Sequence, residues 1–185
     1  MDIADNYKDE LEILNDMHQS YSLLYIALNK IQAEADSGLE DLTLRQLMLL
    51  IAIAHLDPQE ATIVNIASTL GTSKQNVTRL VNHMAKAGYL SSKPGQTDKR
   101  NVNISITDKG LSVMQKNTIN SNKYFLNLFK NFTRIEIKSF RKSLEKLSNY
   151  DNTKQKYFEE QVKIDIGKEQ TDMKIFLEQI RKLFL

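Results

Sequence analysis

The stretch that decides the fold runs from Thr62 to Gly110 and reads TIVNIASTLGTSKQNVTRLVNHMAKAGYLSSKPGQTDKRNVNISITDKG. It begins with two short helical patterns that meet at Gly71, a residue able to take the left-handed backbone of a sharp helix–helix turn. After Gly88 the apolar residues recur with the period of a strand, since Val102, Ile104 and Ile106 alternate with polar residues. The stretch therefore predicts a helix-turn-helix followed by a two-stranded hairpin.

The second helix of this stretch is predicted over Lys74–Ala87, with Ser73 as its N-cap. Its apolar face consists of Val77, Leu80, Val81 and Met84. At about 100° per residue, the opposite face presents Gln75, Thr78, Arg79, Asn82 and Lys86. These side chains are cationic or can form hydrogen bonds, and none is acidic. A helix that reads base edges in the major groove must present such groups, so the pattern indicates a DNA-recognition helix.

The tip of the hairpin, Pro94–Arg100, is rich in turn residues and basic at its end. An arginine there could enter a narrow minor groove, which attracts guanidinium groups. We expect Arg100 to do so and Asp98 to orient it without contacting DNA. The alternative is a solvent-exposed hairpin with one surface ion pair of little energetic value.

The same residues resemble the MarR (multiple antibiotic resistance regulator) family of bacterial transcription factors. Asp98-Lys99-Arg100 followed by Ile106-Thr107-Asp108-Lys109-Gly110 matches the family's wing pattern D-x-R-x5-[LI]-T-x-x-G, and Leu42-Thr43-x-x-Gln46, Asn76–Val81 and Gly88-Tyr89-Leu90 fit as well. The resemblance covers roughly Tyr7 to Tyr150. It implies a homodimer that binds pseudo-palindromic operators, usually as a repressor, and that a small ligand often releases. The residues that we expect at the DNA are Thr72, Ser73, Lys74, Gln75, Asn76, Thr78, Arg79, Asn82, Lys86, Lys99 and Arg100.

The segments that flank the deciding stretch are predicted to be helical and to pair two copies of the chain. In the first segment, residues spaced alternately by four and three positions form a seam: Tyr7, Leu11, Leu14, His18, Tyr21, Tyr25 and Leu28. This seam predicts a long helix that packs on other helices and ends at Ser37-Gly38. A capping box at Thr43–Gln46 opens an almost wholly apolar helix, which should therefore be central. Helices are also expected over Leu111–Phe132 and, from a capping box at Thr133–Glu136, to Tyr150.

The tail, residues 151–185, runs past the usual end of the family. Its last part has a strong amphipathic face that contains Met173, Phe176, Leu177, Ile180, Leu183 and Phe184. So much apolar surface requires a partner, and we expect the tail to pack on the dimerisation lobe, across the dimer. The chain is thus divided into a first dimerisation helix (1–42), a winged helix-turn-helix (43–110), further dimerisation helices (111–150) and an extension (151–185), in a mainly α fold with a small β wing.

Composition narrows the classes of function. The chain has 185 residues and no Cys, which excludes disulfides and thiolate metal sites. Its acidic N-terminus and short apolar runs do not fit a signal peptide or a membrane span, so a soluble cytoplasmic protein is expected. The formal net charge of +2 is uneven, because residues 1–42 carry two Lys against ten Asp and Glu, whereas residues 111–150 carry eight basic side chains against two acidic ones. Positive charge gathered in the middle of a chain favours a polyanionic partner.

The sequence contains no catalytic motif, so an enzyme is not expected, and neither a metal nor another cofactor is predicted. The three His residues are scattered, and His18 near Glu12 and Asp16 makes only a weak metal site. By resemblance, an effector pocket would be polar at His18, Tyr21, Tyr25 and His55. The alternative function is a winged-helix module that holds a protein complex together without reading DNA.

Overall fold

The computed structural model describes residues 7–94, 102–151 and 170–184. Contacts divide the chain into two compact units, Met1–Gly38 and Leu39–Leu185. The first unit contains one long helix, α2 (Lys8–Gly38), on which only Ala35 is buried. None of the described helices is both long and apolar enough to span a bilayer.

The second unit is built around α3 (Leu44–His55), as its nearly continuous apolar sequence predicted. Leu47, Leu49, Leu50, Ala52 and Ile53 of this helix are all buried. The predicted capping box is confirmed, since the Thr43 hydroxyl accepts from the Gln46 N–H and the Gln46 side chain accepts from the Thr43 N–H. Residues from the neighbouring elements close the core around α3: Leu42, Leu56, Ala61, Ile66, Ala67, Val77, Val81, Met84, Leu90, Ile104 and Val113.

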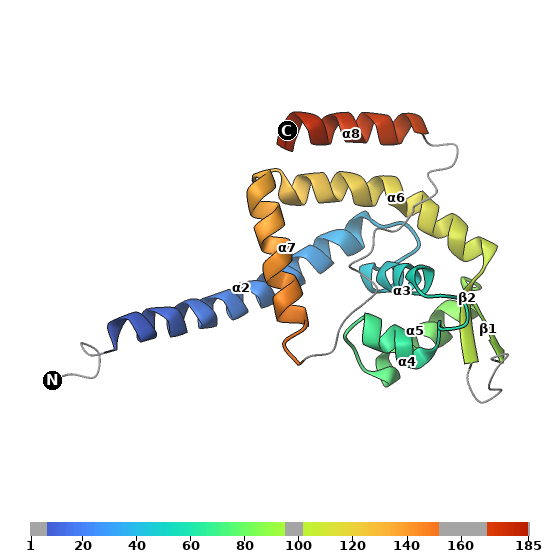
Figure 1. The fold of residues 1–185 in the computed structure, drawn as a ribbon. Coiled ribbons are helices and arrows are strands. Elements are labelled where there is room, and N and C mark those ends of the chain that lie inside the picture. The colour runs from blue at the N-terminus through green and yellow to red at the C-terminus, as the bar shows by residue number, and fades with distance from the viewer. Residues whose placement is uncertain (1–6, 95–101, 152–169, 185) are drawn as a thin grey trace. The chain divides into compact units, whose positions relative to one another are not determined.

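Two helices and a hairpin follow α3, in the predicted order. Helices α4 (Ile63–Thr69) and α5 (Lys74–Lys86) lie against each other and lead into strands β1 (Leu90–Pro94) and β2 (Val102–Ile106) (Figure 1). The strands pair antiparallel with Leu90 opposite Ile106 and Ser92 opposite Ile104. A bridge from Thr62 to Asn103, and a hydrogen bond from the Ile104 N–H to the Ala61 oxygen of 2.8 Å, fasten the hairpin to the start of α4. The mainly helical fold with a β wing is thereby confirmed.

The two glycines at the helix ends hold the sharp turns. Gly71 has φ 59° and Gly88 has φ 80°, both in the left-handed region that favours glycine. After α4, the Thr72 N–H donates to the Ala67 oxygen and the Gly71 N–H to the Ser68 oxygen, which is the Schellman arrangement. The end of α5 repeats this pattern around Gly88. These turns set the angle at which α5 leaves α4 and at which the hairpin leaves α5.

Three helices follow the hairpin: α6 (Asp108–Phe129), α7 (Arg134–Ser148) and α8 (Gln170–Phe184). Helix α6 begins before the predicted Leu111, because the Thr107 hydroxyl caps it by accepting from the Gly110 N–H. It ends at Phe129 and not at Phe132, since Thr133 opens the capping box of α7. Rings of Phe129, Phe132 and Phe140 join these two helices, and α8 lies alongside α6 (Figure 1).

Candidate nucleic-acid interface

Helix α5 is held by one face and exposes the other. Val77, Val81 and Met84 are buried in the core of the second unit. On the opposite face the side chains predicted to meet DNA are all exposed: Gln75, Asn76, Thr78, Arg79, Asn82 and Lys86. The geometry therefore gives α5 a solvent-facing surface of amide, hydroxyl and cationic groups.

The N-terminus of α5 is ordered by its cap and by a chain of polar contacts. The Ser73 hydroxyl accepts from the Asn76 N–H at 3.2 Å, as the predicted N-cap requires. The Asn76 amide nitrogen donates to the Thr72 hydroxyl at 3.2 Å, and the Asn76 Oδ1 accepts from the Arg79 guanidinium at 2.7 Å. Arg79 is thus held along the helix by a neighbour three residues away, a spacing that places side chains side by side.

The sequence does not predict this Thr72–Asn76–Arg79 chain. It predicts all three residues at the DNA, but as separate contacts. The only signal that could have indicated their pairing is the spacing of four and three residues on one helix. An arginine held by an amide points its remaining N–H donors in a fixed direction, which favours recognition of a planar acceptor pair such as a base edge.

The electrostatics of this face are those of a polyanion-binding surface. No Asp or Glu occurs between Thr62 and Lys93, whereas Lys74, Arg79, Lys86 and Lys93 lie in the same stretch. The partial positive charge at the N-terminus of α5 adds to the charge of Lys74. Thr78 donates its hydroxyl to the Lys74 carbonyl at 2.8 Å, which leaves the oxygen of Thr78 available as an acceptor.

The wing is described only at its base. Strands β1 and β2 place Lys93 beside Asn103 in the ladder. The wing-tip residues fall outside the described residues: Lys99 and Arg100, expected at the DNA, and Asp98, expected to orient Arg100. These roles stay predictions.

The end of α5 is joined to the start of α6 by the second half of the wing motif. Thr107 donates its hydroxyl to the Gly88 oxygen at 2.7 Å, and Lys109 donates its ammonium group to the Ala87 oxygen at 2.7 Å while lying over the Tyr89 ring. A Cβ on Gly110 would lie 2.2 Å from the Tyr89 oxygen. Thr107, Lys109 and Gly110 therefore have a structural role, since they fasten the end of α5 to the start of α6.

The residues predicted for an effector pocket belong to different units. His18, Tyr21 and Tyr25 are exposed on α2, with Tyr21 76% and Tyr25 65% exposed. His55 is half-buried at the end of α3, where its Nδ1 lies 2.7 Å from the Ile51 oxygen. Within the described residues, no three His, Cys, Asp or Glu side chains gather as a metal site would require. The pocket remains a prediction.

Comparison with known proteins identifies the winged-helix segment. A model of the MarR family matches residues 40–101. The HTH-type transcriptional regulator PapX of Escherichia coli is 29% identical over 100 residues, which are 54% of this chain and 61% of PapX. The chain thus matches about three fifths of that relative's length.

Solved structures share the fold. The S. aureus MepR–DNA complex superposes with a TM-score of 0.64 at 20% identity, over 70% of this chain and 96% of MepR. A mutant MarR from E. coli complexed with operator DNA gives a TM-score of 0.63 at 22% identity, over 72% of this chain and 96% of MarR. Bordetella bronchiseptica BpsR, solved in work on regulation of its DNA binding by 6-hydroxynicotinic acid, gives 0.63 at 18% identity, over 70% of this chain and 98% of BpsR. The MarR family model thus matches the winged helix-turn-helix segment of this chain, and the solved structures share its fold.

Proposed function

We propose that the chain is a sequence-specific DNA-binding transcriptional repressor, not an enzyme, and that it acts in the bacterial cytoplasm as a homodimer on a pseudo-palindromic operator. The observation that carries this proposal is the exposed face of α5. It is free of acidic residues, and its side chains are the types that pair with base edges and phosphates.

The proposed roles follow from position along α5. Gln75, Asn76, Thr78 and Arg79 lie in its first two turns, from which a recognition helix reaches base edges. Thr72, Ser73 and Lys74 surround the helix N-terminus, where backbone N–H groups and positive charge favour a phosphate. Asn82 and Lys86 lie further along the exposed face, and Lys86 contacts the phosphate backbone of the DNA. Arg100 and Lys99 of the wing extend the contact into the flanking minor groove.

A homodimer accounts for the exposed apolar surface of α2. Except for His18, the predicted seam of this helix is apolar or aromatic, and its large members are 45% to 76% exposed in the single chain: Tyr7, Leu11, Leu14, Tyr21, Tyr25 and Leu28. A soluble protein rarely leaves so continuous a stripe in water, so a second copy is the partner that we assign to it. Two α5 helices that read successive half-sites would lie about 34–36 Å apart.

Release by a small molecule is the remaining part of the proposal. The BpsR structure comes from work on the regulation of its DNA binding by 6-hydroxynicotinic acid, a small aromatic acid. The candidate contacts here are His18, Tyr21, Tyr25 and His55, because imidazole and phenol groups can bind such a ligand by stacking and hydrogen bonding.

The second candidate function is a protein-interaction module. The exposed apolar side chains of α2 and α7 favour it, among them Ile135, Phe140 and Leu147. It leaves the acid-free face of α5 without a role. The two functions differ in one measurable property, which is a salt-dependent preference for particular DNA sequences.

The experiment that tests the proposal is a fluorescence-anisotropy titration at two salt concentrations. The probes are the tightest 30-base-pair duplex that the unaltered protein recovers from a random library and a scrambled duplex of the same composition. We expect selective binding that weakens steeply with salt, because bound cations release counterions from DNA. Arg79→Ala should cost about 1–3 kcal/mol on the selected duplex and reduce selectivity, whereas Lys86→Ala should weaken both duplexes alike.

Two outcomes would contradict the proposal. Equal binding of both duplexes by the unaltered protein, with no dependence on salt, would favour the interaction module. Equal losses on both duplexes for both variants would refute the assignment of base reading to Arg79. Glu60→Gln is the matched control, since this residue lies at an exposed position outside α5.

A further inference from the structure

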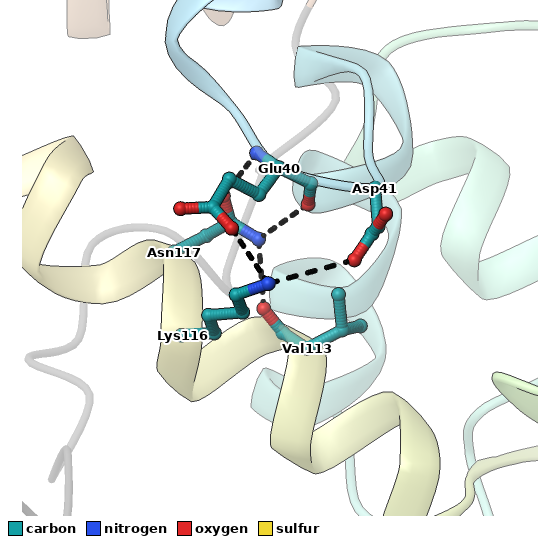
Figure 2. Close-up of polar contacts among 5 residues, drawn as sticks. All are labelled: Glu40, Asp41, Val113, Lys116 and Asn117. Atoms are coloured by element: carbon teal, nitrogen blue, oxygen red, sulfur yellow. Dashed lines mark hydrogen bonds and ion pairs between the residues drawn. The ribbon is translucent and has the colours of Figure 1, made fainter.

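Asn117 of α6 is a buried polar residue whose amide oxygen and nitrogen both form hydrogen bonds. Its side chain is 0% exposed. Its Oδ1 accepts from the Glu40 N–H at 2.9 Å, and its Nδ2 donates to the Glu40 oxygen at 2.9 Å and to the Val113 oxygen at 2.8 Å (Figure 2). The amide therefore binds both backbone groups of one residue that lies 77 positions earlier in the chain. Such two-point pairing resembles one rung of a β-ladder.

Glu40 belongs to the connector, defined here as Leu39–Leu42, through which the chain passes from α2 toward α3. The connector is not helical, and Asp41 within it has φ 61°, a conformation unusual for a residue with a side chain. Leu42 is buried in the core of the second unit. The connector thus has a defined path, and Asn117 supplies the partners that its backbone would otherwise find in water.

Lys116 adds an outer contact to the same place. Its ammonium group lies 2.6 Å from the Glu40 carboxylate and 3.7 Å from that of Asp41 (Figure 2). The hydrogen bond and the charge of Glu40 raise the pKa of Lys116 above its usual value. Because these side chains are more than half exposed, the ion pairs are screened by solvent and guide the connector more than they stabilise it.

The other end of this part of α6 is fixed to the recognition helix. Thr107, Lys109 and Gly110 hold the start of α6 against Ala87–Tyr89, directly after α5. From Gly110 to Asn117 is seven residues, or about 10 Å at 1.5 Å per residue. One stretch of helix therefore contacts the end of α5 at its first turn and the connector about two turns later.

We propose that Asn117 is a positioning residue for DNA recognition: through α6 it fixes the connector with respect to α5. The inference rests on the proposed function, because the position of α5 matters to the extent that α5 reads DNA. The chemistry of the amide group explains why an asparagine fits this position. Glu40 presents one N–H and one oxygen, and among side chains of this size only asparagine offers the matching acceptor and donor.

Asparagine at this position cannot be replaced without leaving a group of the connector unpaired. Alanine removes both partners from Glu40 and opens space in a buried site. Leucine fills the space but leaves the same two backbone groups without hydrogen bonds. Either change should free the connector while leaving the exposed face of α5 chemically intact, so a loss of selectivity in such a variant would come from position and not from contact.

The test compares Asn117→Ala with Gln115→Ala, an exposed amide on the same helix, in the full-length protein. Anisotropy uses the library-selected 30-base-pair duplex and its scrambled counterpart, with concentrations corrected for the active fraction found by stoichiometric titration. We expect Asn117→Ala to lose about tenfold in affinity for the selected duplex and little for the scrambled one. Hydrogen exchange of the Glu40 amide should rise by about tenfold as well. Gln115→Ala should match the unaltered protein in both measurements.

Affinities for the two duplexes that fall equally, or that do not fall, would overturn the positioning role. If Asn117→Ala does not fold, hydrogen exchange in the unaltered protein tests the positioning role instead. The Glu40 amide should then exchange slowly although it lies outside every described helix, and more slowly when the selected duplex is bound. Exchange unaffected by the duplex would refute the inference. If the unaltered protein prefers neither duplex, the proposed function fails. Slow exchange of the Glu40 amide would still show that Asn117 holds the backbone of Glu40.

Discussion

Replacement of Gly110 by alanine tests the junction between α5 and α6 most directly. A Cβ at this position would lie 2.2 Å from the Tyr89 oxygen and 2.8 Å from Ile106 Cγ2. Real Cβ contacts essentially never come closer than 3.0 Å, so the Tyr89 oxygen must retreat by 0.8 Å or more. That oxygen is a backbone atom and accepts a hydrogen bond of 3.0 Å from the Thr107 N–H. It can move only if the turn after α5 moves with it.

The expected magnitude combines three terms. Overpacking a fixed site costs about 1–3 kcal/mol, and loss of the Thr107–Tyr89 hydrogen bond adds about 1 kcal/mol. Alanine returns about 1 kcal/mol through its better helix propensity. The net destabilisation is therefore about 1–3 kcal/mol, with a reduced affinity for the selected DNA duplex because the end of α5 has shifted.

Gly38→Ala is the matched control. A Cβ on Gly38 would meet nothing within 4 Å, so this variant should be as stable as the unaltered protein or slightly more stable. Both variants are compared by urea unfolding at one protein concentration, since the stability of the proposed dimer would depend on concentration. If Gly110→Ala unfolds at the same urea concentration as Gly38→Ala, the reasoning from close contact is refuted.

Three further outcomes are expected. Thr107→Val should lower the free energy of unfolding by about 1–2 kcal/mol, which is more than Thr43→Val should. Both hydroxyls cap a helix, but of the two only that of Thr107 also donates to a distant carbonyl, that of Gly88. Equal losses in urea unfolding would contradict this. Hydrogen bonds from the Thr133 N–H and hydroxyl lower the pKa of Glu136, so its stabilising contribution is present above the unfolded pKa and is lost as pH falls through the lower folded value. Glu136→Gln should therefore flatten the acid side of a plot of melting temperature against pH, and an unchanged curve would refute the coupling. Deletion of residues 151–185 should weaken the dimer in sedimentation equilibrium and lower its melting temperature, since α8 lies alongside α6; a truncated chain with unchanged values would show that the tail supports neither.

The sequence by itself determined the local elements of this protein. The apolar period of α5, the caps at Thr43, Ser73 and Thr133, and the left-handed glycine at position 71 are all present in the structure as predicted. Each depends on residues within about four positions of one another, because caps and helix faces arise from the geometry of a single turn. The exposed face of α5 followed from the same periodicity.

The tertiary structure decided how these elements are joined. Three contacts link residues from 19 to 77 positions apart: the hydrogen bond from Thr107 to Gly88, the contact of Gly110 with Tyr89, and the hydrogen bonds between Asn117 and Glu40. In the sequence, Asn117 is one polar residue on an amphipathic helix; its spacing from Val113 places it on the apolar face, but nothing in that spacing predicts its pairing with Glu40. This pairing depends on which backbone groups another segment presents, and that is settled only when the helices pack.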